Sequence, residues 1–242
     1  MIGYYQNNGS ICLGTKLCVI TGANSGIGLE TSRFFVRKGW YVCAISRNKH
    51  KLIKLTSGIS NCFPIECDIT DSKQVKKVFQ QIYENHGNVE CLINCAGIGL
   101  IKDFSTMSYN EWKSIIETNL TGTFLCIHEA LKYMVPNGAV VNIGSLAGKR
   151  GYEKSTAYCA SKFGVFGLSE ALSVNTINNK IRVILINPGI VNTPMSRKLF
   201  PEKANKALSP NDIAKMIYFL VTELKDVKYV NVDLYGGVDI IR

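Results

Sequence analysis

The sequence predicts an α/β fold with one parallel sheet of seven strands covered by helices on both faces. Short apolar runs of β type alternate with longer stretches of helical period along the chain, which is typical of strand–helix–strand units. Parallel strands of this kind are buried on both sides, which explains their apolar character. No segment between them resembles a domain linker or a repeat.

Seven apolar runs are the predicted strands. They cover residues 17–21, 41–45, 62–66, 89–94, 139–143, 181–187 and 229–234. The clearest helix covers 71–86, because its apolar residues recur at helical spacing and form one stripe. The stripe consists of Val75, Val78, Phe79, Ile82 and Tyr83.

Two further helices have marked starts. Ser108 with Glu111 predicts a capping box, followed by a long helix that ends near Pro136. Ser209 followed by Pro210 predicts the start of another, because proline suits the first helical position.

Length and composition indicate one domain. With 242 residues and 46% hydrophobic content, the chain can bury one sizeable core. We assign residues 16–242 to this domain and leave residues 1–15 as a leader without a role. The chain has no apolar run long enough for a membrane span and no secretion signal at its start, so we expect a cytoplasmic protein.

Charge and cysteine usage exclude several classes. The net charge is +10, but the lysines are spread along the chain without a basic block, so nucleic acid is not expected as a partner. The positive electrostatic field of the chain favours an anionic cofactor or substrate. The nine cysteines and three histidines include no Cys-x-x-Cys pair, so we expect free thiols and no metal site.

A glycine-rich segment directly follows the first predicted strand and opens a helix. Glycines allow a sharp turn and a close approach to a pyrophosphate, and the helix start offers free N–H groups. This context predicts a doubly wound Rossmann fold with a dinucleotide site. The cofactor-binding candidates here are Gly22, Asn24, Ser25, Gly26, Ile27 and Gly28.

The end of the second predicted strand indicates which dinucleotide binds. Dinucleotide folds often place a carboxylate here, on the adenosine ribose. This chain has Ser46 and Arg47, with no acidic residue from Cys43 to Leu55. A guanidinium suits a 2′-phosphate, so we expect NADP(H), with NAD(H) left open. The alternative is that Arg47 is an ordinary exposed loop residue.

Tyr158 and Lys162 are four residues apart at the start of a predicted helix and therefore share a face. A free tyrosine has a pKa of about 10, and a nearby ammonium and a positive nicotinamide ring would lower it. Ser145 ends the fifth apolar strand, at the edge where open parallel sheets bind ligands. Asn119 lies within a predicted helix, where it is either functional or solvent-facing.

Together these motifs resemble the short-chain dehydrogenase/reductase family in its short single-domain form, over roughly residue 16 to the C-terminus. Asn119, Ser145, Tyr158 and Lys162 match its catalytic tetrad. Cys95 replaces the second asparagine of the family's Asn-Asn-Ala-Gly segment. By resemblance, further cofactor contacts are Asp68, Ile69, Asn94, Ala96, Gly97, Pro188, Gly189, Val191 and Thr193.

The resemblance implies hydride transfer between the nicotinamide and a carbonyl carbon of a small molecule. Tyr158 would exchange a proton with the substrate oxygen, and Ser145 would position that oxygen. Lys162 would hold the ribose and lower the pKa of Tyr158, and Asn119 would support a water that relays the proton. The resemblance also implies a homodimer or homotetramer, formed through the helices that begin near Tyr109 and Ser155.

The substrate is less well defined. Residues 193–208 are expected to form a lid, and basic residues there and after Ser145 suggest an anionic substrate, a 3-oxoacyl group on a carrier or a 3-hydroxy acid. These residues are Lys149, Arg150, Lys154, Arg197, Lys198, Lys203 and Lys206. The alternative is an ordinary solvated lid. The C-terminal segment lacks the Thr-Gly of acyl-carrier reductases, which favours a general carbonyl or hydroxy-acid reductase.

A second class of function stays open on the same fold. Some relatives bind a dinucleotide without catalysis and act as redox sensors. Such proteins generally lose the tyrosine or the lysine, and here both are present.

Overall fold

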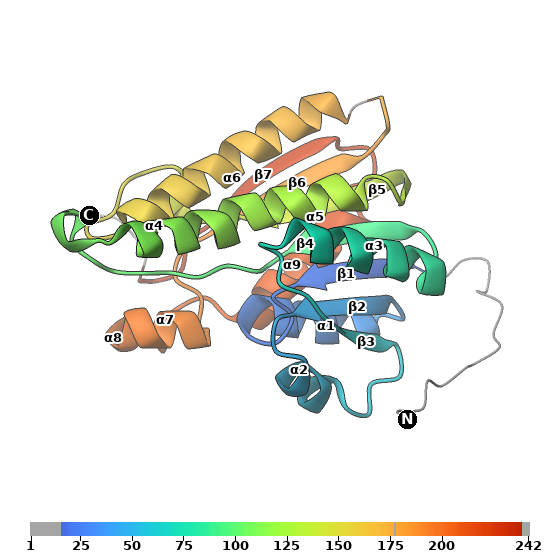
Figure 1. The fold of residues 1–242 in the computed structure, drawn as a ribbon, viewed down its shortest axis with the longest axis horizontal. Helices are drawn as coiled ribbons and strands as arrows, with labels where there is room; N and C mark the ends of the chain where they lie inside the picture. The colour runs from blue at the N-terminus through green and yellow to red at the C-terminus, as the bar shows by residue number, and fades with distance from the viewer. Residues whose placement is uncertain (1–15, 177, 239–242) are drawn as a thin grey trace.

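The computed structural model describes residues 16–176 and 178–238, and within them seven strands form one parallel sheet (Figure 1). The expected fold class is confirmed. The strands are β1 (Leu17–Thr21), β2 (Tyr41–Ser46), β3 (Cys62–Glu66), β4 (Val89–Asn94), β5 (Met134–Ile143), β6 (Arg182–Pro188) and β7 (Tyr229–Leu234). The leader 1–15 lies outside the described residues.

Helices connect the strands. They are α1 (Gly26–Arg37), α2 (Lys49–Thr56), α3 (Ser72–His86), α4 (Tyr109–Ile116), α5 (Gly122–Ala130), α6 (Thr156–Asn175), α7 (Pro194–Leu199), α8 (Pro201–Ala204) and α9 (Pro210–Thr222). A π-helical turn, η2 (Glu117–Thr121), joins α4 to α5, and 3₁₀ turns occur at η1 (Phe104–Thr106) and η3 (Leu146–Gly148). Among the described residues, no helix is long and apolar enough to span a membrane.

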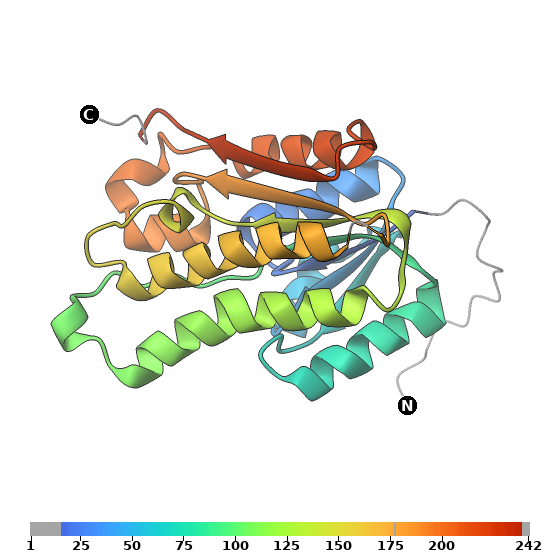
Figure 2. The same ribbon diagram turned by 90° about the horizontal axis from the view of Figure 1, so that it is seen from above.

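Two apolar layers hold the helices against the sheet. Consecutive strand residues point to opposite faces, so Ile20 of β1 packs with α1 and α9, whereas Val19 packs with α3, α5 and α6. Figure 2 shows α3, α5 and α6 along one side of the sheet and α1 and α9 along the other. Burying a large apolar side chain such as Phe35 or Phe79, each at most 1% exposed, contributes about 1.5–3 kcal/mol.

The strand order determines where at the edge of the sheet a ligand-binding crevice opens. It is β3-β2-β1-β4-β5-β6-β7, so the chain runs outward from β1 to β3 and then returns to β4 on the other side of β1. The loops after β1 and β4 therefore diverge. This reversal opens a crevice at the carboxyl ends of the strands, where ligands bind in open α/β sheets.

The capping predictions are confirmed. Ser108 and Glu111 form the capping box at the start of α4. Ser209 caps α9, in which Pro210 is the first helical residue.

Other expectations were wrong in detail. The helix expected to end near Pro136 ends at Ala130, because the chain turns there to start β5, which pairs with β4 from Met134. That early part of β5 is half-exposed or exposed and irregular in register, so it carries no apolar signal. Tyr83 was expected in the buried stripe, but it is 44% exposed and stacks on Tyr133.

Candidate active site

A cavity of about 960 Å³ lies at the carboxyl edge of the sheet, large enough for a dinucleotide's reactive end and a small substrate. It lies between the loops that follow β1, β4, β5 and β6. Its walls include nearly all of the candidate residues: Gly22, Asn24, Ser25, Gly26, Ile27, Gly28, Ser46, Arg47, Asp68, Ile69, Ala96, Gly97, Ser145, Tyr158, Lys162, Pro188, Gly189, Val191 and Thr193.

The glycine turn fits a pyrophosphate. Gly22 has φ +66°, and a Cβ on it would lie 2.8 Å from the Ala96 backbone. A Cβ on Gly28 would lie 2.5 Å from the Gly22 carbonyl oxygen. The turn therefore packs too closely for side chains. Ser25 makes no side-chain cap bond and the first turn of α1 contains no acidic residue, so this helix start is open to an anion.

The far end of the cavity, beyond the glycine turn, carries both a cation and a carboxylate. Arg47 is exposed, lines the cavity and forms no ion pair among the described residues. The Ser46 hydroxyl accepts a hydrogen bond from the Asn48 N–H at 3.1 Å. Asp68 lines the same end, and its Oδ1 accepts from the Thr70 N–H and hydroxyl. In the described part of the chain, neither Asp68 nor another carboxylate pairs with the Arg47 guanidinium.

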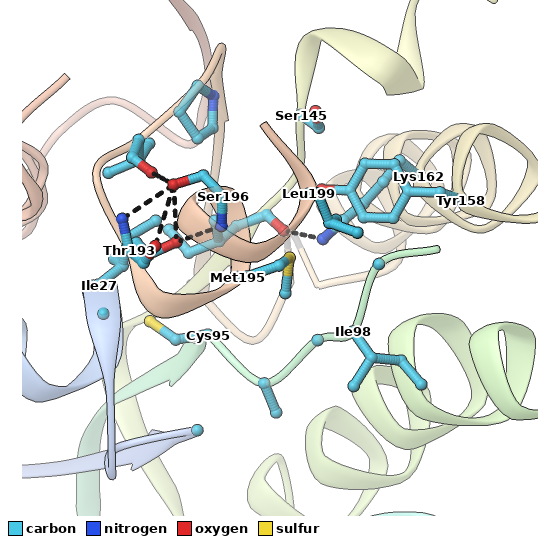
Figure 3. Close-up of a pocket in the computed structure, with 18 of the residues that line it drawn as sticks. Ile27, Cys95, Ile98, Ser145, Tyr158, Lys162, Thr193, Met195, Ser196 and Leu199 are labelled. Atoms are coloured by element: carbon cyan, nitrogen blue, oxygen red, sulfur yellow. Dashed lines mark hydrogen bonds between the residues drawn. The ribbon is translucent and has the colours of Figure 1, made fainter. Parts of the chain in front are cut away.

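Ser145, Tyr158 and Lys162 face the same cavity (Figure 3). The Lys162 Nζ donates to the Ile143 carbonyl at 2.8 Å and lies 5.7 Å from the centre of the Tyr158 ring. Lys162 is 6% exposed, and burial lowers the pKa of its ammonium to about 8. The side chains come from the end of β5 and from adjacent turns of α6, as the sequence predicts.

Burial also changes the proton affinity of Tyr158. It raises the pKa of the phenol above its ordinary value, and a hydrogen bond with Ser145 opposes this. In the chain alone burial has the largest influence on this pKa, so the expected net decrease is not seen. Tyr158 is therefore a protonated phenol at neutral pH, which suits a proton donor.

Asn119 and Asn94 do not line the cavity but support its walls. The Asn119 Oδ1 accepts from the Ile98 N–H at 2.8 Å, and its Nδ2 donates to the Ile98 carbonyl and to the Ser161 hydroxyl, both at 3.0 Å. The Asn94 Nδ2 donates to Asn142 at 2.9 Å, within the buried sheet. Asn119 lies in the π-helical turn η2, and such turns frequently mark functional sites.

Ser161 is a residue of the site that was not predicted from the sequence. Its buried hydroxyl donates to the Tyr158 carbonyl at 2.8 Å and accepts from Asn119. It therefore links the loop after β4, through Asn119, to the turn of α6 that carries both Tyr158 and Lys162. The signal was its position three residues after Tyr158, from which a helical serine reaches back to the main chain.

Ser161→Ala is expected to lower kcat about 5-fold and the free energy of unfolding by about 1 kcal/mol, because one buried hydrogen-bond partner of Asn119 is lost. Steady-state kinetics and urea unfolding measure the two effects. Ser173→Ala is the matched control, since Ser173 makes the same kind of bond, to Glu170, but is only half-buried. A fall in stability with unchanged kcat would contradict a positioning role.

Few of the basic residues expected at the substrate entrance line the cavity. Of the seven basic residues considered, Arg150 and Lys203 line the cavity. Three others are engaged elsewhere: Lys149 with Asp233, Lys154 with Asp103 and Arg197 with Asn192. The cavity mouth is therefore less basic than the sequence suggests.

The cysteines have no evident role in chemistry. The eight in the described part of the chain are free thiols, and no cluster there has the side chains to hold a metal ion. Cys95 lines the cavity, but burial raises the pKa of its thiol to about 12. A thiol of that pKa is a poor nucleophile at neutral pH.

Known proteins are similar to this chain in sequence. Residues 16–204 match the family described as short chain dehydrogenase. The chain is 35% identical over 237 residues to 3-oxoacyl-(acyl-carrier-protein) reductase FabG of Thermotoga maritima, covering 91% of this chain and 95% of that protein. It is 30% identical to carbonyl reductase family member 4 of Xenopus laevis, covering 86% and 91%.

A solved structure that contains a bound cofactor has a similar fold. ElxO in a tyrosine-to-phenylalanine form with NADPH bound has a TM-score of 0.82 and 29% identity, covering 90% of this chain and 97% of that one. The chain therefore belongs to the short-chain dehydrogenase/reductase family of oxidoreductases, which use a nicotinamide dinucleotide to interconvert carbonyl and alcohol groups of small molecules.

Proposed function

We propose that this protein is an NADP(H)-dependent carbonyl reductase, with residues 16–242 as its catalytic domain and Tyr158 as its acid and base. The observation that carries the proposal is the convergence of Ser145, Tyr158 and Lys162 on one cavity with the glycine turn. General carbonyl or 3-oxoacyl compounds are the substrates, in line with the reductases among the relatives.

The cavity residues divide the binding of the cofactor among them. The turn from Gly22 to Gly28 would hold the pyrophosphate, and Arg47 the 2′-phosphate. Lys162 would bind the nicotinamide ribose, beside Gly189 and Thr193. The bound nicotinamide supplies or accepts the hydride. NAD(H) would bind without the contact from Arg47.

The protein's own groups handle the proton. The Ser145 Oγ accepts from the Ala147 N–H at 3.1 Å, and with a substrate bound its own hydrogen would be donated to the substrate oxygen and position it. Tyr158 donates its proton to that oxygen in reduction, and the Lys162 ammonium stabilises the phenolate left behind. We assign Asn119 a positioning role, because its amide is engaged by Ile98 and Ser161.

Arg47→Ala is expected to raise the Kd for NADPH about 10-fold and to leave the Kd for NADH within about 2-fold. A charge-assisted hydrogen bond to phosphate is lost, and solvent exposure keeps the effect at the lower end of its range. Fluorescence titration with both cofactors measures it. Lys54→Ala serves as control, because Lys54 is exposed on α2 and does not line the cavity. Equal weakening of both cofactors would contradict the assignment.

Oxidation of NADPH and of NADH, followed in parallel with a panel of ketones, diketones and acetoacetyl esters, tests the reaction itself. Turnover with a preference for NADPH is the expected result. Tight NADPH binding without turnover of any compound would instead favour the non-catalytic redox sensor.

We further propose a homodimer or homotetramer formed across α5 and α6. Phe124 of α5 and Phe163 of α6 are 47% and 46% exposed, so neither belongs to the core. Val165 of α6, by contrast, is buried within the core.

A further inference from the structure

The half of the cavity beyond the cofactor turn is mainly apolar around the reacting hydroxyls. Its apolar walls come from the loop after β4, from η3 and from the segment that includes α7. They are formed by Ile98, Leu100, Leu146, Met195, Leu199 and Phe200. Five of these side chains keep part of their surface exposed, and only Leu146 is fully buried. A bound apolar group would cover this surface and gain hydrophobic stabilisation.

Acidic groups are far from this wall or solvated. Asp68 and Glu153 are the acidic side chains among the described residues that line the cavity. Asp68 belongs to the adenosine end, and the Glu153 side chain is 88% exposed. The hydroxyls of a polyol placed beside Tyr158 would therefore find no nearby carboxylate acceptor among the described residues that line the cavity.

The cations at the mouth are held by aromatic rings. The Arg150 guanidinium lies 5.0 Å from the centre of the Tyr152 ring and donates to its hydroxyl at 2.7 Å. The Lys203 ammonium lies 5.8 Å from the centre of the Phe200 ring. Solvent screens charges at such a rim, so they offer little to a carboxylate placed next to the reacting carbonyl.

Helix α7 is anchored at its start. Thr193 and Ser196 form a capping box there, and the buried Ser196 hydroxyl donates to the Val191 carbonyl at 2.5 Å. Thr193 also packs against Gly26, where a Cβ would lie 2.9 Å from its methyl group. These contacts fix α7 beside the glycine turn, so its other residues hold defined positions over the cavity.

The far side of α7 rests on the loop after β4. Met195 and Leu199 are four residues apart and share a face. A Cβ on Gly99 would lie 2.9 Å from the Leu199 Cδ1 and 3.3 Å from the Met195 Sδ. These two side chains bridge the cavity from one wall to the other. Figure 3 shows both on the side of Ser145, Tyr158 and Lys162.

We propose that the site takes an uncharged ketone with apolar groups on both sides of its carbonyl, and that Leu199 and Met195, resting on Gly99, limit its size. The inference rests on the carbonyl reductase function proposed above. It excludes polyols and ketones with a carboxylate next to the reacting group. Leu199 and Met195 are then the specificity-determining residues of the site.

Two matched pairs of compounds test the substrate class. 3-Pentanone and 1,3-dihydroxyacetone have the same shape, with methyl groups in the one replaced by hydroxyls in the other. Ethyl acetoacetate and acetoacetate differ in charge. We expect kcat/KM at least about 10-fold higher for 3-pentanone and for the ester, because buried hydroxyl or charged groups would lack partners. Equal or higher values for dihydroxyacetone or acetoacetate overturn the inference but leave the reductase function in place.

Absence of turnover on every compound, with NADPH still bound, overturns both the inference and the proposed function. Binding is followed separately by fluorescence titration, so the two failures are distinguishable.

Substitutions at the contact test the size limit. Leu199→Ala is expected to raise kcat/KM for 4-tert-butylcyclohexanone relative to 3-pentanone about 10-fold, because a few methylenes of pocket space are gained. Lys198→Ala is the control, since Lys198 is exposed and does not line the cavity. An unchanged ratio in Leu199→Ala overturns the assignment.

Gly99→Ala, alone and combined with Leu199→Ala, forms a double-mutant cycle that tests the contact between the two residues. Gly99 does not have a positive φ, so the backbone accepts alanine and only the contact with α7 opposes it. We expect Gly99→Ala alone to lower kcat/KM for 3-pentanone several-fold and Leu199→Ala in the same chain to restore most of it, which is the signature of a direct contact. Independent, additive losses overturn the proposed bridge.

Discussion

Tyr158→Phe is expected to lower kcat by about 10³-fold while leaving the fold and NADPH binding intact. The substitution removes one oxygen and keeps the ring, so the packing of α6 is preserved. Burial holds the pKa of the Tyr158 phenol above its ordinary value, so the group carries its proton at neutral pH and is ready to give it to a carbonyl oxygen. General acid catalysis of this kind contributes about 10²–10⁴-fold.

Single-turnover and steady-state oxidation of NADPH measure the loss, and thermal unfolding with and without NADPH shows that the variant is folded and binds cofactor. Tyr152→Phe is the matched comparison, because this tyrosine lines the same cavity and its hydroxyl accepts from Arg150. There we expect less than about 10-fold loss, in keeping with an exposed polar contact. A Tyr158→Phe enzyme as active as the parent would remove Tyr158 from the mechanism.

Local patterns predicted the fold well because parallel strands are buried on both faces. Every predicted strand is present, and β1, β3, β4 and β7 have the expected bounds. The errors fall where the pattern is not apolar. The early part of β5 contains Pro136 and Asn137, the latter with φ +66°, and it joins the sheet only because β4 lies beside it.

The site was predictable where a motif carries its own geometry. The glycine turn needs only one strand and one helix, and Tyr158 and Lys162 need only one helical turn. Contacts between distant segments gave no such signal. The contact of Leu199 with Gly99 and the bond from Asn119 to Ser161 each join segments far apart in the chain. Whether a basic side chain such as Lys149 is available to the cavity likewise depends on partners such as Asp233, which no local sequence pattern reveals.

Arg182 is a buried cation whose hydrogen-bond partners, among the described residues, are main-chain carbonyls. It begins β6, is 4% exposed, and donates to the carbonyls of Leu220, Val221 and Leu224, at 3.3, 2.9 and 3.3 Å. These carbonyls belong to the last turn of α9 and the residues after it, where a helix has unpaired acceptors and a partial negative charge. Burial lowers the pKa of the guanidinium, but an arginine stays charged at neutral pH.

Arg182→Met is expected to lower the free energy of unfolding by about 3 kcal/mol, because it keeps the apolar stem but leaves several buried carbonyls without a donor. For a chain of this size the melting temperature should fall by about 6–12 °C. Urea and thermal unfolding measure both. Arg33→Met is the control. Arg33 forms a half-exposed ion pair with Glu30 on α1, and its loss should cost less than about 1 kcal/mol.

Arg182→Lys separates charge from geometry. An ammonium keeps the interaction with the end of α9 but cannot reach carbonyls on several sides as the planar guanidinium does, so its stability should fall between the parent and Arg182→Met. Equal stability of the lysine variant and the parent would show that charge alone holds α9. Equal stability of the methionine variant and the parent would show that these carbonyls find other donors. If stability falls most in Arg182→Met and partly in Arg182→Lys, the several hydrogen bonds of the planar guanidinium stabilise the protein. These bonds then attach the end of α9 to the sheet beside β6.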